Sequence, residues 1–223
     1  MTMTPGLRKF ALTAHLTFSV GWIGAVIAYL ALDLTAVINQ DIQMVRAAYL
    51  AMELTALYVI VPLALAALLT GIAMSLGTSW GLFRHYWVLI SLVLTILATV
   101  VLLQHMQTVS FFAGIAAETD SADVGGLRGG LRSELLHAGI GLLVLLVIEV
   151  LNVYKPQGMT AYGRRKASQV TLPSGSSDDT RSGLGQGSTT RTPRWVRVVG
   201  IHAVGLALLF VVMHLIGGGL RIH

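Results

Sequence analysis

The residues of this chain that could do chemistry are ionisable side chains within long apolar segments. An ionisable group inside a bilayer is costly, so each one is a candidate functional residue by default. Histidines occur in four of the apolar segments and glutamates in two of them. The candidates are His15, His105, His137, His202, His214, Glu53 and Glu149.

These candidates lie at two depths in the membrane. Each depth follows from the number of residues between the candidate and the basic end of its segment, at a rise of about 1.5 Å per helical residue. His15, His202 and Glu149 share a layer near one side of the membrane. The other half receives His105, His137, His214 and Glu53. Chemistry that needs two imidazoles is therefore possible in either half.

Haem is the first chemistry that these histidines suggest, because neutral imidazoles on facing helices are common axial ligands. Pairing His15 with His202 predicts a haem b site in the first layer. Pairing His105 with His137 or His214 predicts a second site, and two stacked sites would suit electron transfer across the membrane. Gly21 and Gly24 lie opposite His15 on its helix, so they make no room for a macrocycle beside it.

Copper is the second chemistry. His105 precedes Met106, and Met213 precedes His214, so two segments each place a thioether beside an imidazole. These soft ligands suit Cu(I), and the chain has no cysteine to compete with them. Neighbouring helical residues point about 100° apart, however, so one ion cannot easily take both members of a pair.

Two alternatives need no cofactor. Pairs such as His15–Glu149 and His105–Glu53 would satisfy each other between helices of a structural or partner-binding membrane protein, with Met106 and Met213 as ordinary core residues. A proton-coupled small-solute transporter would use Glu53 and Glu149. The sequence contains no hydrolase triad or HExxH pattern, so it names no reaction and leaves open whether the protein is an enzyme.

The composition assigns the chain to the membrane class. Its 223 residues are 55% hydrophobic and only 11% charged, against about 25% charged in soluble domains. The absence of cysteine excludes disulfides, thiolate metal sites and covalent haem attachment. The net charge of +5 does not indicate nucleic-acid binding, because most basic residues flank the apolar segments.

The elements that must position these groups are membrane helices. Four apolar segments, at about 10–37, 47–76, 87–112 and 135–154, predict an all-α protein with a four-helix antiparallel transmembrane bundle in residues 1–154. Pro62 predicts a kink in the second segment, and Glu118–Arg132 is expected to be a loop, with a flexible glycine-rich turn at 125–130. Residues 155–194 predict a disordered basic linker, and residues 195–223 a fifth membrane helix with a short tail.

The first helix is expected to lie centrally in the bundle. One of its faces carries polar and aromatic residues at helical spacing, namely His15, Ser19, Trp22, Val26, Tyr29 and Asp33. The roughly opposite face is a stripe of small residues, Thr17, Gly21, Gly24 and Ala28, of the kind that allows helices to approach closely.

The distribution of lysine and arginine predicts the orientation. With the N-terminus in the cytoplasm, most of these residues fall on the cytoplasmic side, and the C-terminus lies outside. The run Tyr162–Lys166 in the linker would also attract anionic lipid. We therefore expect a multi-pass protein of the bacterial plasma membrane.

Two resemblances follow from short stretches of the chain. Leu12–His15, Gly21–Gly24, Gly81–Trp87, Tyr154–Gly158 and Tyr162–Lys166 resemble an uncharacterised family of bacterial predicted integral membrane proteins, over roughly residues 7–166. That family has no assigned activity, so it implies a fold and a location. More distantly, His15, Trp22 and Gly24 resemble the copper-resistance D membrane domain and certain four-helix haem-binding membrane proteins.

Overall fold

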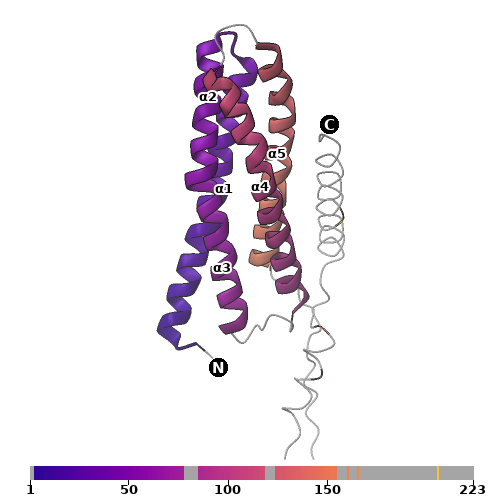
Figure 1. Cartoon of the computed structure of the whole chain (residues 1–223). Helices are drawn as coiled ribbons and strands as arrows, with labels where there is room; N and C mark the ends of the chain where they lie inside the picture. The colour runs from indigo at the N-terminus through magenta and orange to yellow at the C-terminus, as the bar shows by residue number, and fades with distance from the viewer. Residues whose placement is uncertain are drawn as a thin grey trace, which may run out of the picture.

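The structure is a computed structural model that describes residues 3–77, 85–118 and 124–154, together with the single residues Thr160, Arg165 and Gly205. The described chain is helical, and its long helices lie side by side in one bundle (Figure 1). In order they are α1 (Pro5–Ile38), α2 (Ile42–Thr55), α3 (Val61–Gly77), α4 (Tyr86–Glu118) and α5 (Val124–Tyr154). A π-helical turn, η1 (Ala56–Ile60), joins α2 to α3.

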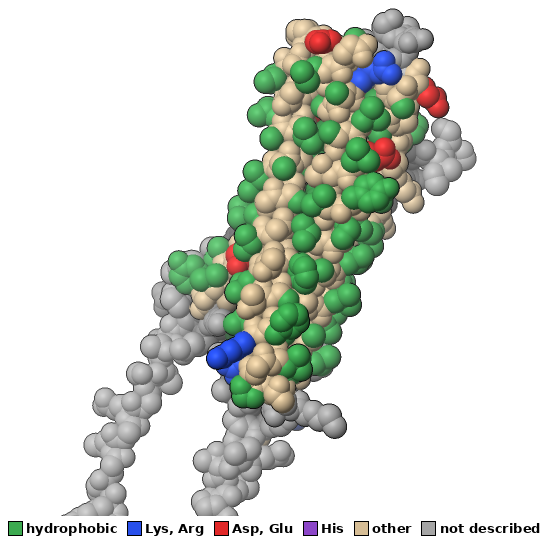
Figure 2. Space-filling view, turned by 90° about the vertical axis from the view of Figure 1, so that its left-hand side faces the viewer, with side chains coloured by type: hydrophobic (Ala, Val, Ile, Leu, Met, Phe, Trp, Pro, Cys, Tyr) green, Lys and Arg blue, Asp and Glu red, His purple; other side chains and the backbone are tan. Residues whose placement is uncertain are grey.

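Four stretches of this bundle are long and apolar enough to cross a membrane: Pro5–Ile38, Ile42–Gly77, Tyr86–Glu118 and Ser133–Tyr154. Large apolar side chains such as Phe10, Leu69 and Phe111 are exposed, which is costly in water but suits a lipid environment. Figure 2 shows hydrophobic side chains along the length of one face, with Lys and Arg toward its two ends. The prediction of a four-helix multi-pass membrane bundle is confirmed.

Helix α1 begins where its sequence provides a start signal. The side chain of Thr4 accepts a hydrogen bond from the Leu7 amide at 3.4 Å, and Pro5 occupies the first turn, where its missing N–H costs nothing. The predicted polar-aromatic face points inward, since Trp22, Tyr29 and Asp33 are buried. Helix α1 packs against α2, α3 and α5, which makes it central.

The small-residue stripe on α1 does not form the close helix contact that the sequence predicted. Thr17, Gly24 and Ala28 are exposed, and a methyl group added at Gly24 would meet nothing within 4 Å. Gly21 alone approaches a neighbour, with Leu63 at 3.4 Å from an added Cβ. The buried face is instead the polar-aromatic one, because its larger side chains fill the space between helices.

The second segment adapts to Pro62 by changing its helical geometry. Proline lacks an amide hydrogen and its ring crowds the preceding turn. The π-helical turn η1 ends two residues before Pro62, so the helix is widened where the regular bonding pattern must change. The segment nevertheless continues as one membrane span from Ile42 to Gly77.

The expected loop at Glu118–Arg132 is wrong over most of its length, because helix α5 already begins at Val124. The glycines at 125–130, predicted to form a flexible turn, are helical. At Gly130 the missing side chain has a packing role. An added Cβ would lie 2.5 Å from the Phe112 ring, so only glycine lets α5 approach α4 this closely.

The buried apolar residues form two clusters. The larger one, the central core, runs along the bundle and includes Trp22, Met52, Leu94 and Ile148. The smaller one, which we call the end plug, consists of Ala36, Val45, Ala48, Tyr49, Ala116 and Leu131. It closes the end of the bundle where α1 ends and α2 begins.

The predicted linker at 155–194, its attraction for anionic lipid and the predicted fifth helix at 195–223 lie outside the described residues, apart from the single residues Thr160, Arg165 and Gly205.

Arg46 joins α2 to the end of α4. Its Nε donates to the carbonyl of Ala116 at 2.6 Å and its Nη2 to the carbonyl of Ala117 at 3.1 Å. We expect Arg46→Met to lower the free energy of unfolding by about 1.5 kcal/mol, because the last carbonyls of α4 lose a charged donor. Denaturant titration of the detergent-solubilised protein measures this change. Gln43→Met, at an exposed position of α2, is the control and should change it by less than about 0.5 kcal/mol.

Candidate functional site

Three helices meet at one carboxylate oxygen in the half of the bundle next to the end plug. Glu134 on α5 is 1% exposed. Its Oε2 accepts a hydrogen bond from Nε2 of His105 on α4 at 2.8 Å and another from the hydroxyl of Tyr29 on α1 at 3.0 Å. We call Tyr29, Asp33, His105, Glu134 and His137 the buried polar cluster.

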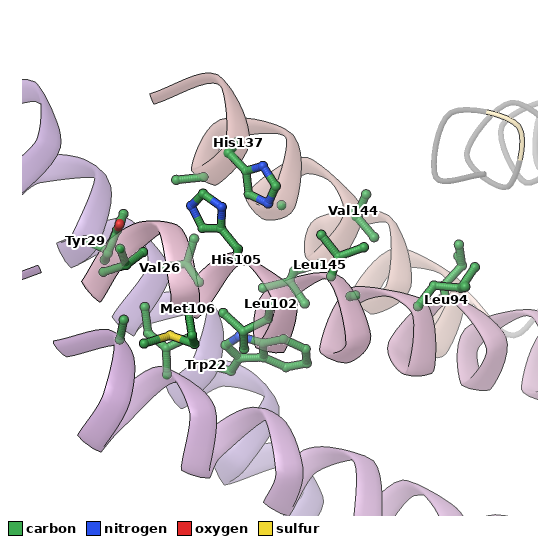
Figure 3. A pocket seen from close by; sticks show the side chains of 18 residues that line it. Trp22, Val26, Tyr29, Leu94, Leu102, His105, Met106, His137, Val144 and Leu145 are labelled. Carbon is green, nitrogen blue, oxygen red and sulfur yellow. The ribbon is translucent and has the colours of Figure 1, made fainter. Parts of the chain in front are cut away.

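His137 completes this arrangement from the helix face that also carries Glu134. Its ring stacks on the ring of His105, with centroids 3.8 Å apart and planes 6° from parallel. Figure 3 shows the two rings facing each other from neighbouring helices. The nitrogen lone pairs lie in the two ring planes and do not meet between them, so a parallel stack is unsuited to holding one metal ion between two imidazoles.

Asp33 lies one helical turn beyond Tyr29 on α1 and is 0% exposed. Within the part of the chain that the structure describes, neither of its carboxylate oxygens has a hydrogen-bond partner, and the same holds for Oε1 of Glu134. Asp33 and Glu134 are close enough to interact electrostatically. Two buried carboxyl groups with three oxygens that lack partners are an uncommon arrangement, because buried polar atoms are nearly always hydrogen-bonded.

A small cavity adjoins the buried polar cluster (Figure 3). Its volume is about 90 Å³, and Tyr29, His105 and His137 lie at its edge. Most of its wall is apolar, from residues such as Leu94, Val101 and Val144. Water in a cavity needs several polar partners, so this space is dry over most of its length.

A larger open cavity of about 530 Å³ occupies the other half of the bundle. It is lined from four helices: α1 contributes His15, α3 contributes Gly71, α4 contributes Ser91, and α5 contributes Glu149. Arg8 on α1 and Asn152 on α5 also line it. Trp22 and Leu145 line both cavities and separate them. The hydroxyl of Ser91 is buried and has no hydrogen-bond partner in the described parts of the chain.

His15 is held in a defined orientation at the wall of this open cavity. Its Nδ1 lies 3.1 Å from the Ala67 carbonyl and 3.1 Å from Oγ1 of Thr70. The Thr70 hydroxyl donates its own proton to the Ala66 carbonyl at 2.6 Å, so both neighbours of Nδ1 act as acceptors. Nδ1 therefore carries the proton, and in the neutral ring Nε2 keeps its lone pair.

Gly71 makes this position possible. A Cβ added there would lie 3.2 Å from Cε1 of His15, tighter than ordinary van der Waals contact. The imidazole therefore rests against α3 at a place where a side chain would push it away.

The structure brings some of the predicted candidates together. His105 and His137 are in contact, and Met106 lines the small cavity with them. His15 and Glu149 share the open cavity, as the depth count predicts, but His15 is hydrogen-bonded to Ala67 and Thr70. The expected pair His105–Glu53 is wrong, because His105 bonds to Glu134. His202, Met213 and His214 lie outside the described residues.

Sequence reasoning missed Glu134, because it assigned the start of α5 to a loop. A helical signal was present, since Glu134 and His137 are three residues apart and so share a face once the helix starts earlier. Asp33 was recognised as part of the inward face of α1, but its contact with Glu134 depends on how α1 packs against α5.

Among the residues that the structure describes, no three His, Asp or Glu side chains lie close enough together to hold a metal ion. No family model, curated protein or solved structure matches the chain. The two resemblances stated above therefore stay predictions.

The contribution of the hydrogen bond from Tyr29 to Glu134 to the stability of the bundle can be tested directly. Tyr29→Phe keeps the ring and removes the donor, which leaves a buried carboxylate with one partner fewer. We expect the free energy of unfolding to fall by about 1.5–3 kcal/mol, as for hydrogen bonds to charged groups. Tyr58→Phe, at an exposed tyrosine, is the matched control. An equal effect of the two substitutions in the same denaturant titration would contradict this role of Tyr29.

Proposed function

We propose that this protein binds haem b in the open cavity, with Nε2 of His15 as an axial ligand to the iron. The orientation of His15 is the observation that carries the proposal. Histidines that bind metals usually donate their other ring N–H to a carbonyl or carboxylate, which fixes the ring and its tautomer. His15 does this toward Ala67 and has no hydrogen bond at Nε2 among the described residues.

The cavity supports the same proposal. Its volume of about 530 Å³ is within the range of roughly 300–1,000 Å³ for small-molecule and cofactor sites. Its walls combine apolar residues such as Leu12, Ile23 and Leu92 with a few polar groups. Arg8 is positioned to pair with a negatively charged substituent of a cofactor, and the Ser91 hydroxyl offers a hydrogen bond that the protein itself does not use.

The second axial ligand stays a prediction. His202 would supply it if the fifth segment packs against this cavity, and the iron would then be six-coordinate. With the N-terminus in the cytoplasm, as the lysine and arginine distribution predicts, the haem would lie in the cytoplasmic half of the bundle. Copper at His105, Met106, Met213 and His214 has weaker support, because Nε2 of His105 already bonds to Glu134.

A proton-coupled transporter is the second candidate, and one observation favours it. Glu149 lines the open cavity together with His15, so a solute there would meet an ionisable pair. Glu53, the other glutamate expected for this function, lines neither of the two cavities. A protein that binds no chromophore would favour this candidate or a structural role.

The test is a reduced-minus-oxidised absorption spectrum of the full chain, purified in detergent after expression with haem precursors. We expect a b-type spectrum in the wild type and its loss in His15→Ala, because the ring that binds the iron is removed. His85→Ala is the matched control, since His85 lines neither cavity, and it should retain the full spectrum. Wild-type protein that stays colourless after incubation with hemin contradicts the proposal.

Gly71→Ala provides a subtler test of the same geometry. The added methyl group lies against the His15 ring, so we expect less bound haem per protein without loss of the folded bundle. Gly24→Ala is the control, because the space around Gly24 is open. Haem content, measured by the pyridine haemochrome assay, should fall only in the first variant.

A further inference from the structure

The buried polar cluster in the other half of the bundle calls for an explanation that haem binding does not supply. Asp33 and Glu134 are 0% and 1% exposed, yet three of their four carboxylate oxygens have no hydrogen-bond partner among the described residues. Removing an ionised carboxylate from water costs several kcal/mol even in a polar protein interior. A bundle within a membrane compensates less of this desolvation cost than a soluble protein does, so the charge states of Asp33 and Glu134 matter for the stability of the bundle.

The described side chains around the two carboxyl groups offer little compensating positive charge. Helix α1 contributes the Tyr29 hydroxyl, α2 the Tyr49 ring, α4 His105, and α5 His137. Arg46 on α2 directs its guanidinium to the carbonyls at the end of α4. Among the described side chains, the His105 imidazole is therefore the group that can offer Glu134 a positive charge, and it does so only when it is protonated.

Asp33 is the carboxyl group that is left without a counter-charge. If His105 carries a positive charge, that charge balances one of the two carboxylates, since its Nε2 lies 2.8 Å from Oε2 of Glu134. A second carboxylate beside this pair has no counter-charge, and like charges at close range do not both ionise readily. A neutral carboxylic acid is much less costly in such surroundings than an ion.

We propose that Asp33 and Glu134 form a proton-binding site, in which the two carboxyl groups and His105 share exchangeable protons. The proton on Asp33 has no acceptor that holds it, since neither oxygen of Asp33 is hydrogen-bonded. Asp33 therefore keeps this proton because an ionised carboxylate is costly in an apolar environment. The proton can dissociate when water enters that environment. The proposal is independent of haem, which occupies the other cavity.

The surroundings determine the route by which such a proton exchanges. The end plug, which includes Ala36, Val45 and Leu131, closes the near end of the bundle. On the opposite side, the small cavity is lined by Tyr29, His105 and His137. Trp22 and Leu145 lie between this cavity and the open cavity, because they line both. Protons therefore exchange through transient hydration of the small cavity, from the membrane side to which the open cavity leads.

Infrared difference spectroscopy of the full chain in liposomes tests the site. Protonated carboxylic acids have a carbonyl stretch well separated from the carboxylate bands, and it shifts in D₂O. We expect a band of this kind that changes with pH in the wild type. Asp33→Asn and Glu134→Gln, which preserve side-chain size, should each remove or shift it. Glu118→Gln, at the exposed end of α4, is the matched control.

Isotope labelling keeps the test decisive if either variant fails to fold. Aspartate labelled with ¹³C at its carboxyl group moves the Asp33 band in the wild-type protein. A labelled, pH-dependent carbonyl band that exchanges in D₂O supports the site. A wild-type spectrum without any such band across the pH range of the folded protein overturns it. A band that follows Na⁺ concentration at constant pH would assign the site to a metal cation and also overturn the proposal.

The route has its own pair of variants on α5. Gly141 lines the small cavity, and an added Cβ there meets nothing within 4 Å. Gly141→Leu should fill the cavity and slow H/D exchange of the carboxyl band by at least about tenfold, which corresponds to roughly 1.4 kcal/mol in the barrier. Gly139→Leu, also in open space but outside the cavity, is the control. Equal exchange rates in the two variants would contradict this route.

Discussion

The hydrogen-bonded junction at Glu134 is the contact on which the packing of this bundle depends. The lipid tails of a bilayer are as apolar as leucine side chains. Burial of apolar surface therefore does not by itself fix how one membrane helix is rotated against another. Oε2 of Glu134 joins α5 to His105 on α4 and to Tyr29 on α1. A rotation of any of these helices by one residue would leave a charged group without its partner, which makes the register specific.

The two halves of the bundle differ in how they are closed. Next to the junction, the end plug packs apolar residues from α1, α2, α4 and α5, and Gly130 permits the close approach of Phe112. In the other half the helices surround a cavity of about 530 Å³. The asymmetry gives the protein one sealed half that isolates ionisable groups from water and one open half that is accessible to a ligand.

The histidines differ in chemistry because their hydrogen bonds differ. At His15 the proton is fixed on Nδ1 by two acceptors, so the neutral ring keeps a lone pair on Nε2. At His105 it is Nε2 that bonds to a carboxylate. The first arrangement suits the axial ligand that we propose, and the second suits the proton exchange that we propose, although both residues occur in similar apolar sequence.

From the amino-acid sequence alone, the class of the protein, its four membrane helices and the inward face of α1 can be predicted. These follow from composition, segment length and periodicity, which are local properties. It also placed His15 with Glu149 and His105 with His137 in separate halves, because depth follows from residue counts. The prediction was wrong at the start of α5, where the glycines suggested a turn. For this reason Glu134 was not among the predicted site residues.

Which ionisable groups meet depends on how the helices pack, and the sequence does not reveal it. Glu134 lies 105 residues from Tyr29 and 29 from His105, and no local pattern reports such contacts. The tautomer of His15 likewise depends on acceptors that lie on α3, at Ala67 and Thr70. The physical reason is that periodicity defines the face a residue occupies on its own helix, whereas partnership between faces depends on how whole helices pack to satisfy their buried polar atoms.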